Sequence, residues 1–195
     1  MAPQHPATPS AAAYLADLAH AVQAVDHRQI DRIAEALREA WAAERTIFVA
    51  GNGGSAAAAS HFAIDLGKTT LGDGPVPHRV RAIALTDNTA LLTAWANDVA
   101  YEAVFAEQLR NLGRPGDVLV LISCSGASPN LLAAAQAARE LGVRVIALTG
   151  PGAPLAKLAA LHLEMPGPNM QIIEDLHLAV CHALTLSLRS AIAAA

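Results

Sequence analysis

Cysteine, aromatic residues and clustered charge are all scarce in this chain. Cys124 and Cys181 are its only cysteines, and they lie too far apart for a metal-binding cysteine motif. We interpret both as small buried hydrophobic residues in a protein of a reducing compartment. The formal net charge of −4 argues against a nucleic-acid-binding protein, which normally presents a clustered basic face to phosphates. The composition therefore favours an activity on a small molecule.

Long hydrophobic runs are also missing. Apolar residues make up 53% of the chain, but no run approaches the roughly 20 uninterrupted apolar residues that a membrane helix needs. Residues 1–10, which we expect to be flexible, are rich in proline and lack the basic and apolar succession of a secretory signal. We therefore expect a soluble cytoplasmic protein. Its 195 residues suffice for one domain with a substantial core.

Short apolar runs alternate with helical patterns along the chain. Strands are predicted near residues 46–50, 80–85, 118–122, 143–148 and 160–165. Helices are predicted over residues 11–43, 55–68, 88–94, 101–112, 129–141 and 169–191, with a short helix before the last strand. Strands separated by helical crossovers predict a mainly parallel sheet covered on both faces. The expected fold is a three-layer α/β/α sandwich forming a single domain over residues 1–195.

The first and last predicted helices lie outside this alternation. Residues 11–43 and 169–191 are rich in Ala and Leu, which suits packing between subunits. The pattern allows equally that they only cap the sheet of their own chain.

Two turns of small residues each follow a predicted strand. Residues 51–55 read Gly-Asn-Gly-Gly-Ser, and residues 123–128 read Ser-Cys-Ser-Gly-Ala-Ser. Small residues let the backbone approach a ligand, while unpaired amides at a helix start and nearby hydroxyls suit an anion such as phosphate. The carboxyl ends of parallel strands converge on one crevice, so both turns are predicted to hold the same phosphorylated molecule.

Histidines and carboxylates recur at helical spacing in two segments. His61 and Asp65 stand four apart, and the last helix carries Glu174, His177 and His182, together with Asp175. Such side chains from two helices suit a divalent metal such as zinc, or direct acid and base catalysis. The alternative is a surface helix whose polar residues are solvated or act as caps. Asn97 and Asp98 are interpreted as an ordinary cap that introduces the next helix.

Several of these motifs occur together in one known family. The segments 50–57, 61–63, 122–130, 142–150 and 174–182 resemble the sugar isomerase (SIS) domain, and within it the phosphoheptose isomerases. The resemblance covers essentially the whole chain. It implies a flavodoxin-like sheet and the interconversion of sedoheptulose 7-phosphate and D-glycero-manno-heptose 7-phosphate. It also implies a cytoplasmic homotetramer with zinc near the active site and sites shared between subunits.

Carried over by position, the resemblance implies a set of site residues. The substrate-binding residues would be Asn52, Gly53, Gly54, Ser55, Asn97, Asp98, Ser123, Cys124, Ser125 and Ser128. The metal ligands would be His61, Asp65, Glu174 and His182, and the catalytic residues Asp65, Glu174 and His182.

The chain departs from the family at two of these positions. Phosphoheptose isomerases usually carry Glu where this chain has Asp65, and Gln where it has Glu174. The chain thus keeps a shorter carboxylate at position 65 and adds a second carboxylate at position 174. Two histidines with two carboxylates still suit a dication, because the added anion offsets the metal's charge. The exchange leaves open which carboxylate acts as the base.

The implied chemistry is a proton transfer through an enediolate. Asp65 or Glu174 would be the base, His182 would move protons at the oxygens, and a metal held with His61 would stabilise the charge. Two alternatives remain at this stage. One is a non-catalytic SIS module that binds a sugar phosphate or a partner such as a replication initiator. The other is an isomerase of a different ketose phosphate.

Overall fold

The computed structural model describes residues 10–71 and 76–195, so the flexibility predicted for residues 1–10 falls almost wholly outside the described residues. The α-helices are α1 (Ala11–Ala24), α2 (His27–Ala42), α3 (Gly54–Lys68), α4 (Thr89–Asp98), α5 (Ala106–Leu112), α6 (Pro129–Glu140) and α7 (Met170–Ala193). Three short 3-10 helices are η1 (Thr69–Leu71), η2 (Tyr101–Ala103) and η3 (Pro154–Lys157). The strands are β1 (Thr46–Ala50), β2 (Arg81–Ala84), β3 (Val118–Ser123), β4 (Arg144–Thr149) and β5 (Leu161–Glu164).

The five strands form one parallel sheet in the order β2-β1-β3-β4-β5. Ile47 of β1 lies opposite Ala82 of β2 on one side and Val118 of β3 on the other. Every residue of β1 and β3 is buried. This is the strand order of flavodoxin-like folds, in which the chain changes its winding direction between β1 and β3.

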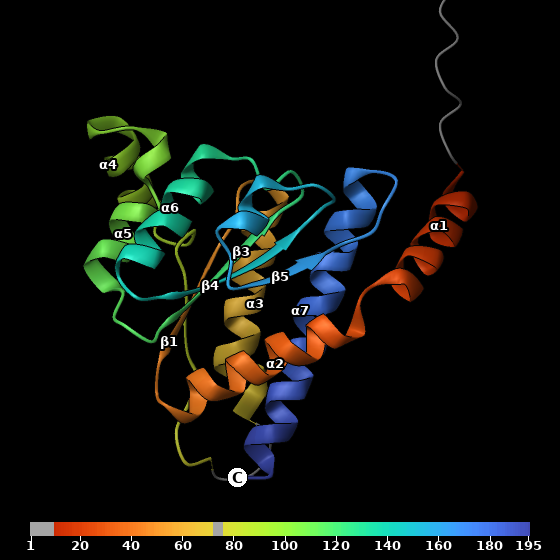
Figure 1. Ribbon diagram of the computed structural model, residues 1–195, viewed down its shortest axis with the longest axis horizontal. Helices are drawn as coiled ribbons and strands as arrows, with labels where there is room; N and C mark the ends of the chain where they lie inside the picture. The colour runs from red at the N-terminus through yellow and green to blue at the C-terminus, as the bar shows by residue number, and fades with distance from the viewer. Residues whose placement is uncertain (1–9, 72–75) are drawn as a thin grey trace, which may run out of the picture.

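Helices cover both faces of the sheet (Figure 1). The helices α1, α2, α3 and α7 share one buried apolar cluster with strand residues such as Ile47 and Val49. The helices α4, α5 and α6 lie on the other face, against Phe48 and Leu119. Successive side chains of a strand point to opposite faces, so each central strand contributes to both clusters. The predicted three-layer α/β/α sandwich is confirmed.

The last helix, α7, is the most apolar long helix of the described chain. Its length and its mean hydropathy of 1.3 would allow it to cross a membrane. In the fold it packs against α1, α2 and α3, and Leu176, Leu184 and Leu188 are buried there. One side of α7 is therefore part of the core of the domain, while Leu186 on the same helix is exposed.

The helical stretch predicted over residues 11–43 consists of two helices, α1 and α2. Val25 is extended, with φ −65° and ψ 137°, and separates α1 from α2. The side chain of Asp26 accepts hydrogen bonds from the backbone amides of Arg28 and Gln29, at 3.0 and 3.3 Å. An aspartate at this position starts a new helix because it satisfies amides that lack an intrahelical partner.

The interpretation of Asn97 and Asp98 as a cap for the next helix is wrong. They are the last two residues of α4, which continues past the predicted end at residue 94. Leu92, Trp95 and Ala96 pack against the apolar cluster beneath α6, and this contact extends the helix. The predicted helix over residues 101–112 divides into η2 and α5.

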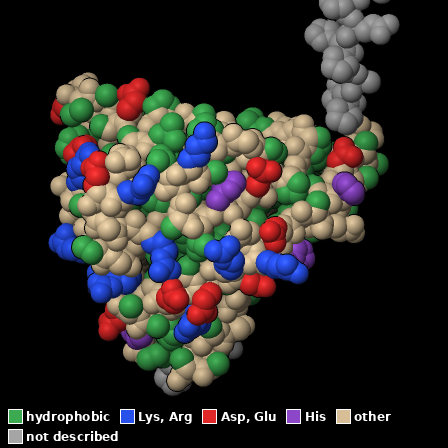
Figure 2. Space-filling model, in the orientation of Figure 1, with side chains coloured by type: hydrophobic (Ala, Val, Ile, Leu, Met, Phe, Trp, Pro, Cys, Tyr) green, Lys and Arg blue, Asp and Glu red, His purple; other side chains and the backbone are tan. Residues whose placement is uncertain are grey.

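Basic and acidic side chains are mixed on the molecular face seen in Figure 2. On α2, Arg38 pairs with Glu35, and Arg144 of β4 reaches Glu39 at 2.8 Å. Such exposed pairs contribute little to stability.

Candidate functional site

The site forms where β1 and β3 end. These neighbouring strands lead to α3 and α6 on opposite faces of the sheet, because β2 lies beyond β1 and β4 lies beyond β3. In open α/β sheets, ligands bind in the crevice at this switch point. Both small-residue turns of the sequence lie here, one after each strand.

The turn after β1 needs its glycines for three different reasons. A Cβ on Gly51 would lie 2.5 Å from the backbone oxygen of Ser55, so the chain can pass there only without a side chain. Gly53 has φ 55°, which favours glycine, and it begins α3 without a side-chain cap. A Cβ on Gly54 would lie 2.7 Å from Oε1 of Glu174. The first amides of α3 therefore stay open, with a carboxylate next to them.

The turn after β3 offers hydroxyl groups. The Ser123 Oγ accepts the amide of Gly126 at 3.0 Å, and the Ser125 Oγ accepts that of Ala127 at 3.3 Å. Each hydroxyl that accepts a backbone hydrogen bond still has its own hydrogen to donate. Ser128 precedes α6 but its side chain makes no capping hydrogen bond. Three hydroxyls and the open start of α6 thus point to an anionic ligand.

A pocket of ≈ 440 Å³ lies between the two turns and the start of α7. Its lining residues are Asn52, Ser55, Ser123, Cys124, Ser125, Ser128, Gly167, Pro168, Asn169, Met170, Ile173 and Glu174. Seven of the residues implied by the resemblance are among them: Asn52, Ser55, Ser123, Cys124, Ser125, Ser128 and Glu174. Gly53 and Gly54 belong to the adjoining turn. Asn97 and Asp98 are not among the lining residues of the described chain, since they lie at the end of α4.

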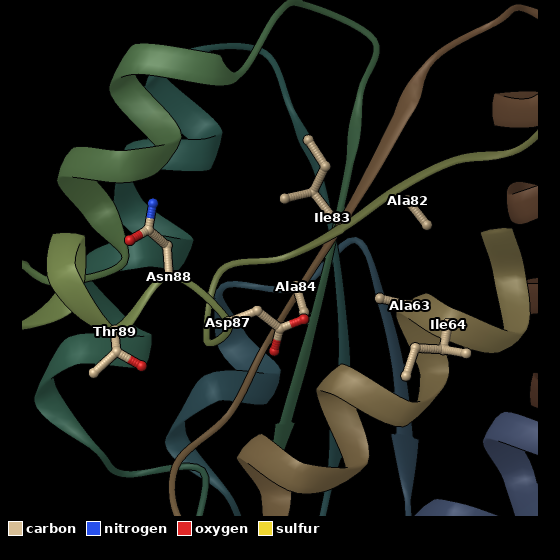
Figure 3. Close-up of a pocket in the computed structure, with 8 residues that line it drawn as sticks. All are labelled: Ala63, Ile64, Ala82, Ile83, Ala84, Asp87, Asn88 and Thr89. Atoms are coloured by element: carbon tan, nitrogen blue, oxygen red, sulfur yellow. The ribbon is translucent and has the colours of Figure 1, made fainter.

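A larger hollow, of ≈ 770 Å³, lies along the edge strand β2 (Figure 3). It is bounded mainly by apolar side chains of α3 and β2, among them Ile64 and Ile83, which are 58% and 40% exposed. Its polar residues are Asp87, Asn88 and Thr89. Open helix starts and converging hydroxyls mark the smaller pocket, so we place the ligand there.

His61, Asp65 and His182 form a compact group on the two helices that also line the pocket. The Nε2 atoms of the histidines lie 3.4 Å apart, and each lies 3.7 Å from Asp65 Oδ2. The other oxygen, Oδ1, accepts the hydroxyl of Thr69 at 3.0 Å. Tetrahedral zinc with bonds of about 2.0–2.1 Å holds its ligand atoms about 3.4 Å apart. The group therefore fits three ligands of a divalent metal.

Glu174 lies apart from this group. It precedes His182 by eight residues on α7, a rise of about 12 Å, and its carboxylate faces Gly54 in the pocket. The structure thus brings three of the four implied metal ligands together and places the fourth beside the start of α3.

For His177, the structure contradicts the alternative interpretation of a solvated surface residue. The side chain is 1% exposed, and neither ring nitrogen has a hydrogen-bond partner within the described chain. Burial lowers its pKa to about 4, an effect that the backbone of Leu148 offsets only in part. His177 is therefore a neutral core residue, and no sequence signal separates it from the exposed His182 of the same helix.

The two cysteines also differ from each other. Cys181 is buried, as predicted, and burial raises the pKa of its thiol. Cys124 is only partly buried and lines the pocket. Burial, and then the charge of Glu174, raise the pKa of Cys124, so its thiol stays protonated at neutral pH. The side chain of Cys124 thus lines the pocket and does not serve as a nucleophile.

Two further residues of the site were missed from the sequence. Asn130 of α6 and Tyr101 of η2 both hydrogen-bond to the side chain of Asn52. Asn130 lies two residues after the serine turn, and this proximity is the signal that could have drawn attention to it.

These features define a class of protein. It is an α/β domain with a pocket suited to a small anionic ligand at a topological switch point, and with a His/Asp/His group suited to a divalent metal on the same helices. The SIS domain family model matches residues 12–150, and the chain belongs to this family. The match ends before β5 and α7, which carry Glu174 and His182.

Individual relatives agree with this family. A phosphoheptose isomerase of Desulfovibrio desulfuricans is 42% identical over 71% of this chain and 65% of its own length. One of Rhodospirillum rubrum is 44% identical over 71% of this chain and 72% of its own. The structure of a phosphoheptose isomerase from Neisseria gonorrhoeae is 35% identical, with a TM-score of 0.84, over 92% of this chain and 96% of that one. This last similarity includes α7.

Proposed function

We propose that the protein is a phosphoheptose isomerase that converts sedoheptulose 7-phosphate to D-glycero-manno-heptose 7-phosphate, the first step of nucleotide-activated heptose synthesis. The observation that carries this proposal is the pocket at the β1/β3 switch point, lined by serine hydroxyls on one side and by Glu174 on the other. Relatives named phosphoheptose isomerase at 42% and 44% identity support the choice of sugar.

The serine turn would hold the phosphate end of the substrate. Ser123, Ser125 and Ser128 have hydroxyl hydrogens to donate, and the open start of α6 adds positive potential. Binding energy at this remote group positions the carbon that is to be deprotonated.

Of the two candidate bases, Asp65 and Glu174, we propose Glu174. It lines the pocket, whereas Asp65 faces two histidines and Thr69. Glu174 would take a proton from C1 of the ketose and return it to C2 of the enediolate, while the proton of the O1 hydroxyl passes to O2, and the two transfers together give an aldose. Asp65 would then serve mainly as a metal ligand.

We propose zinc as the metal, held by His61, Asp65 and His182. Their donor set and mutual distances of 3.4 and 3.7 Å support it. When bound, a dication supplies positive charge for the negative charge that develops on the substrate oxygens. Thr69 would orient Asp65 by donating to its free oxygen.

We further propose a cytoplasmic homotetramer whose sites are shared between subunits. The metal group and the pocket do not share a residue in the described chain. Exposed Ile64 and Ile83 beside the β2 edge give the domain an apolar surface to cover (Figure 3). Free Cys124 and Cys181 suit a reducing compartment.

A second candidate is an isomerase of another ketose phosphate. It is favoured by Glu174, which replaces the amide usual in the family and changes the charge of the pocket. A non-catalytic binding module is less well supported, because it would need neither Glu174 nor the His61/Asp65/His182 group.

Turnover of purified protein tests the proposal. Sedoheptulose 7-phosphate is supplied and aldose formation is followed, with and without prior chelation and with zinc added back. We expect turnover that chelation removes and zinc restores. Turnover of a hexose or pentose ketose phosphate alone would refute the heptose assignment, and turnover of none would refute the isomerase.

A further inference from the structure

Three side chains from three segments meet at the amide of Asn52. The Asn52 Nδ2 donates to Oδ1 of Asn130 at 2.9 Å, and the Nδ2 of Asn130 donates to the Oδ1 of Asn52 at 2.8 Å. The hydroxyl of Tyr101 donates to the same Asn52 oxygen at 3.1 Å. The turn after β1, the start of α6 and η2 are therefore joined at one side chain, which lines the pocket.

The three residues differ in their surroundings. Asn130 is 2% exposed, so its amide is buried and fully dependent on Asn52 for its hydrogen bonds. Tyr101 is 58% exposed, and only its hydroxyl reaches inward. Tyr101 also lies three residues after Asp98, so its hydrogen bond ties the end of α4 to the rim of the pocket.

This arrangement leaves one hydrogen-bond donor of the Asn52 side chain unused. An amide oxygen has two lone pairs and an amide nitrogen two hydrogens. Asn130 and Tyr101 use both lone pairs, and Asn130 uses one hydrogen. Within the described residues, nothing occupies the second hydrogen.

We propose that Asn130 and Tyr101 are positioning residues, which fix the Asn52 amide so that it offers the ligand a donor and no acceptor. A group that only accepts hydrogen bonds, such as an ionised phosphate oxygen, fits this arrangement better than a hydroxyl. The inference rests on the proposed sugar-phosphate function, and it names the phosphate as the group that Asn52 contacts.

Inorganic phosphate is a probe that does not depend on the identity of the sugar. Its dissociation constant is measured by ³¹P NMR titration for the wild type, Asn130→Asp and Asn111→Asp, between pH 5 and 8. Asn111 lies on the exposed side of α5, so this variant controls for the added charge. Circular dichroism checks that each variant is folded.

Asn130→Asp should bind phosphate at least about tenfold more weakly at pH 8, because an ionised carboxylate cannot donate to Asn52. At lower pH the introduced carboxylate becomes a carboxylic acid, which accepts and donates hydrogen bonds as the amide does. The phosphate affinity of Asn130→Asp, divided by that of the wild type at the same pH, should then return toward one. Asn111→Asp should follow the wild type throughout. A merely structural role for Asn130 would not give a pH-dependent recovery.

Tyr101→Phe gives an independent test that does not disturb a buried group. Loss of its hydrogen bond should weaken phosphate binding about two- to tenfold in the wild-type background. In an Asn52→Ala background the same change should have no effect, because Tyr101 acts through Asn52.

Equal effects of Tyr101→Phe in both backgrounds would overturn the proposal, as would wild-type affinity of Asn130→Asp at pH 8 or a wild type that does not bind phosphate. Wild-type turnover of sedoheptulose 7-phosphate is measured in parallel. If turnover fails while the phosphate results hold, only the proposed function falls.

Discussion

At the scale of single residues, the two candidate bases have different surroundings. Asp65 has a side chain only 14% exposed and lies between two histidines. Glu174 faces the open start of α3, where a Cβ on Gly54 would touch its carboxylate. Gly54, which has no side chain, thus leaves the space that the Glu174 carboxylate occupies.

The two departures from the family pattern, Asp65 and Glu174, can be reversed by substitution. Glu174→Gln should lower kcat by about 10²- to 10⁴-fold, the usual contribution of a general base. The double variant Asp65→Glu/Glu174→Gln restores the family pattern and should recover much of that loss. Steady-state kinetics with sedoheptulose 7-phosphate measures both. If Glu174→Gln alone keeps full kcat, the base is another residue.

His177 predicts how stability depends on pH. Its pKa is about 4 in the fold, compared with about 6.5 for an unfolded histidine. The unfolded state therefore binds the proton first as pH falls, so stability is complete above pH 6.5 and declines toward pH 4. Between pH 7.5 and 4.5 this one group should cost about 2 to 3 kcal/mol of unfolding free energy.

Urea unfolding of His177→Phe checks this. The variant should lose about 2 to 3 kcal/mol less than the wild type between the two pH values, because Phe keeps the ring volume without a titrating nitrogen. His20→Phe, a change on the exposed surface of α1, should leave the wild-type dependence unchanged. Parallel pH profiles for the wild type and His177→Phe would contradict the burial of a neutral histidine.

At the scale of helices and strands, α6 starts with a serine at the capping position that makes no capping hydrogen bond. Asp26 and Asn88 cap α2 and α4 with side-chain hydrogen bonds. Ser128 occupies the same position in α6 without making one. The start of α6 is thus left available for a ligand instead of being closed by its own chain.

Ser128→Ala should therefore leave the unfolding free energy nearly unchanged while raising KM for sedoheptulose 7-phosphate. Asp26→Ala is the matched control, because removing a working cap costs about 0.5–2 kcal/mol at a site away from the pocket. Denaturant unfolding and steady-state kinetics on both variants separate the two effects. Loss of stability in Ser128→Ala with an unchanged KM would show that Ser128 is only a cap.

The same elements indicate what the sequence could predict. β1 was predicted with its observed ends, because its buried apolar run lies between turn residues. The break at Asp26 was missed because the alanine-rich flanks favour a continuous helix. The end of α4 was missed because it depends on the packing of Trp95 and Ala96 against the apolar cluster on that face of the sheet. The serine turn was predicted from its chemistry. Asn130 and Tyr101 were not, because their contact with Asn52 joins distant parts of the chain.

At the scale of the whole molecule, α3 and α7 each contribute to two places. Ser55 and Glu174 line the pocket, and His61 and His182 form the potential metal group farther along the same helices. Both histidine side chains are 47% exposed, so the group faces away from its own core. A homotetramer would allow the metal group of one chain to serve the pocket of another.

Mixing of inactive chains tests this sharing. Glu174→Gln removes the base from the pocket, and His182→Gln removes a ligand from the metal group, so each variant should be inactive alone. If sites combine parts of two chains, co-expression should restore activity, because some interfaces then pair an intact pocket with an intact metal group. If each site is built within one chain, every site keeps a defect and no activity returns. Light scattering on the mixed and separate variants establishes that all have the same oligomeric state.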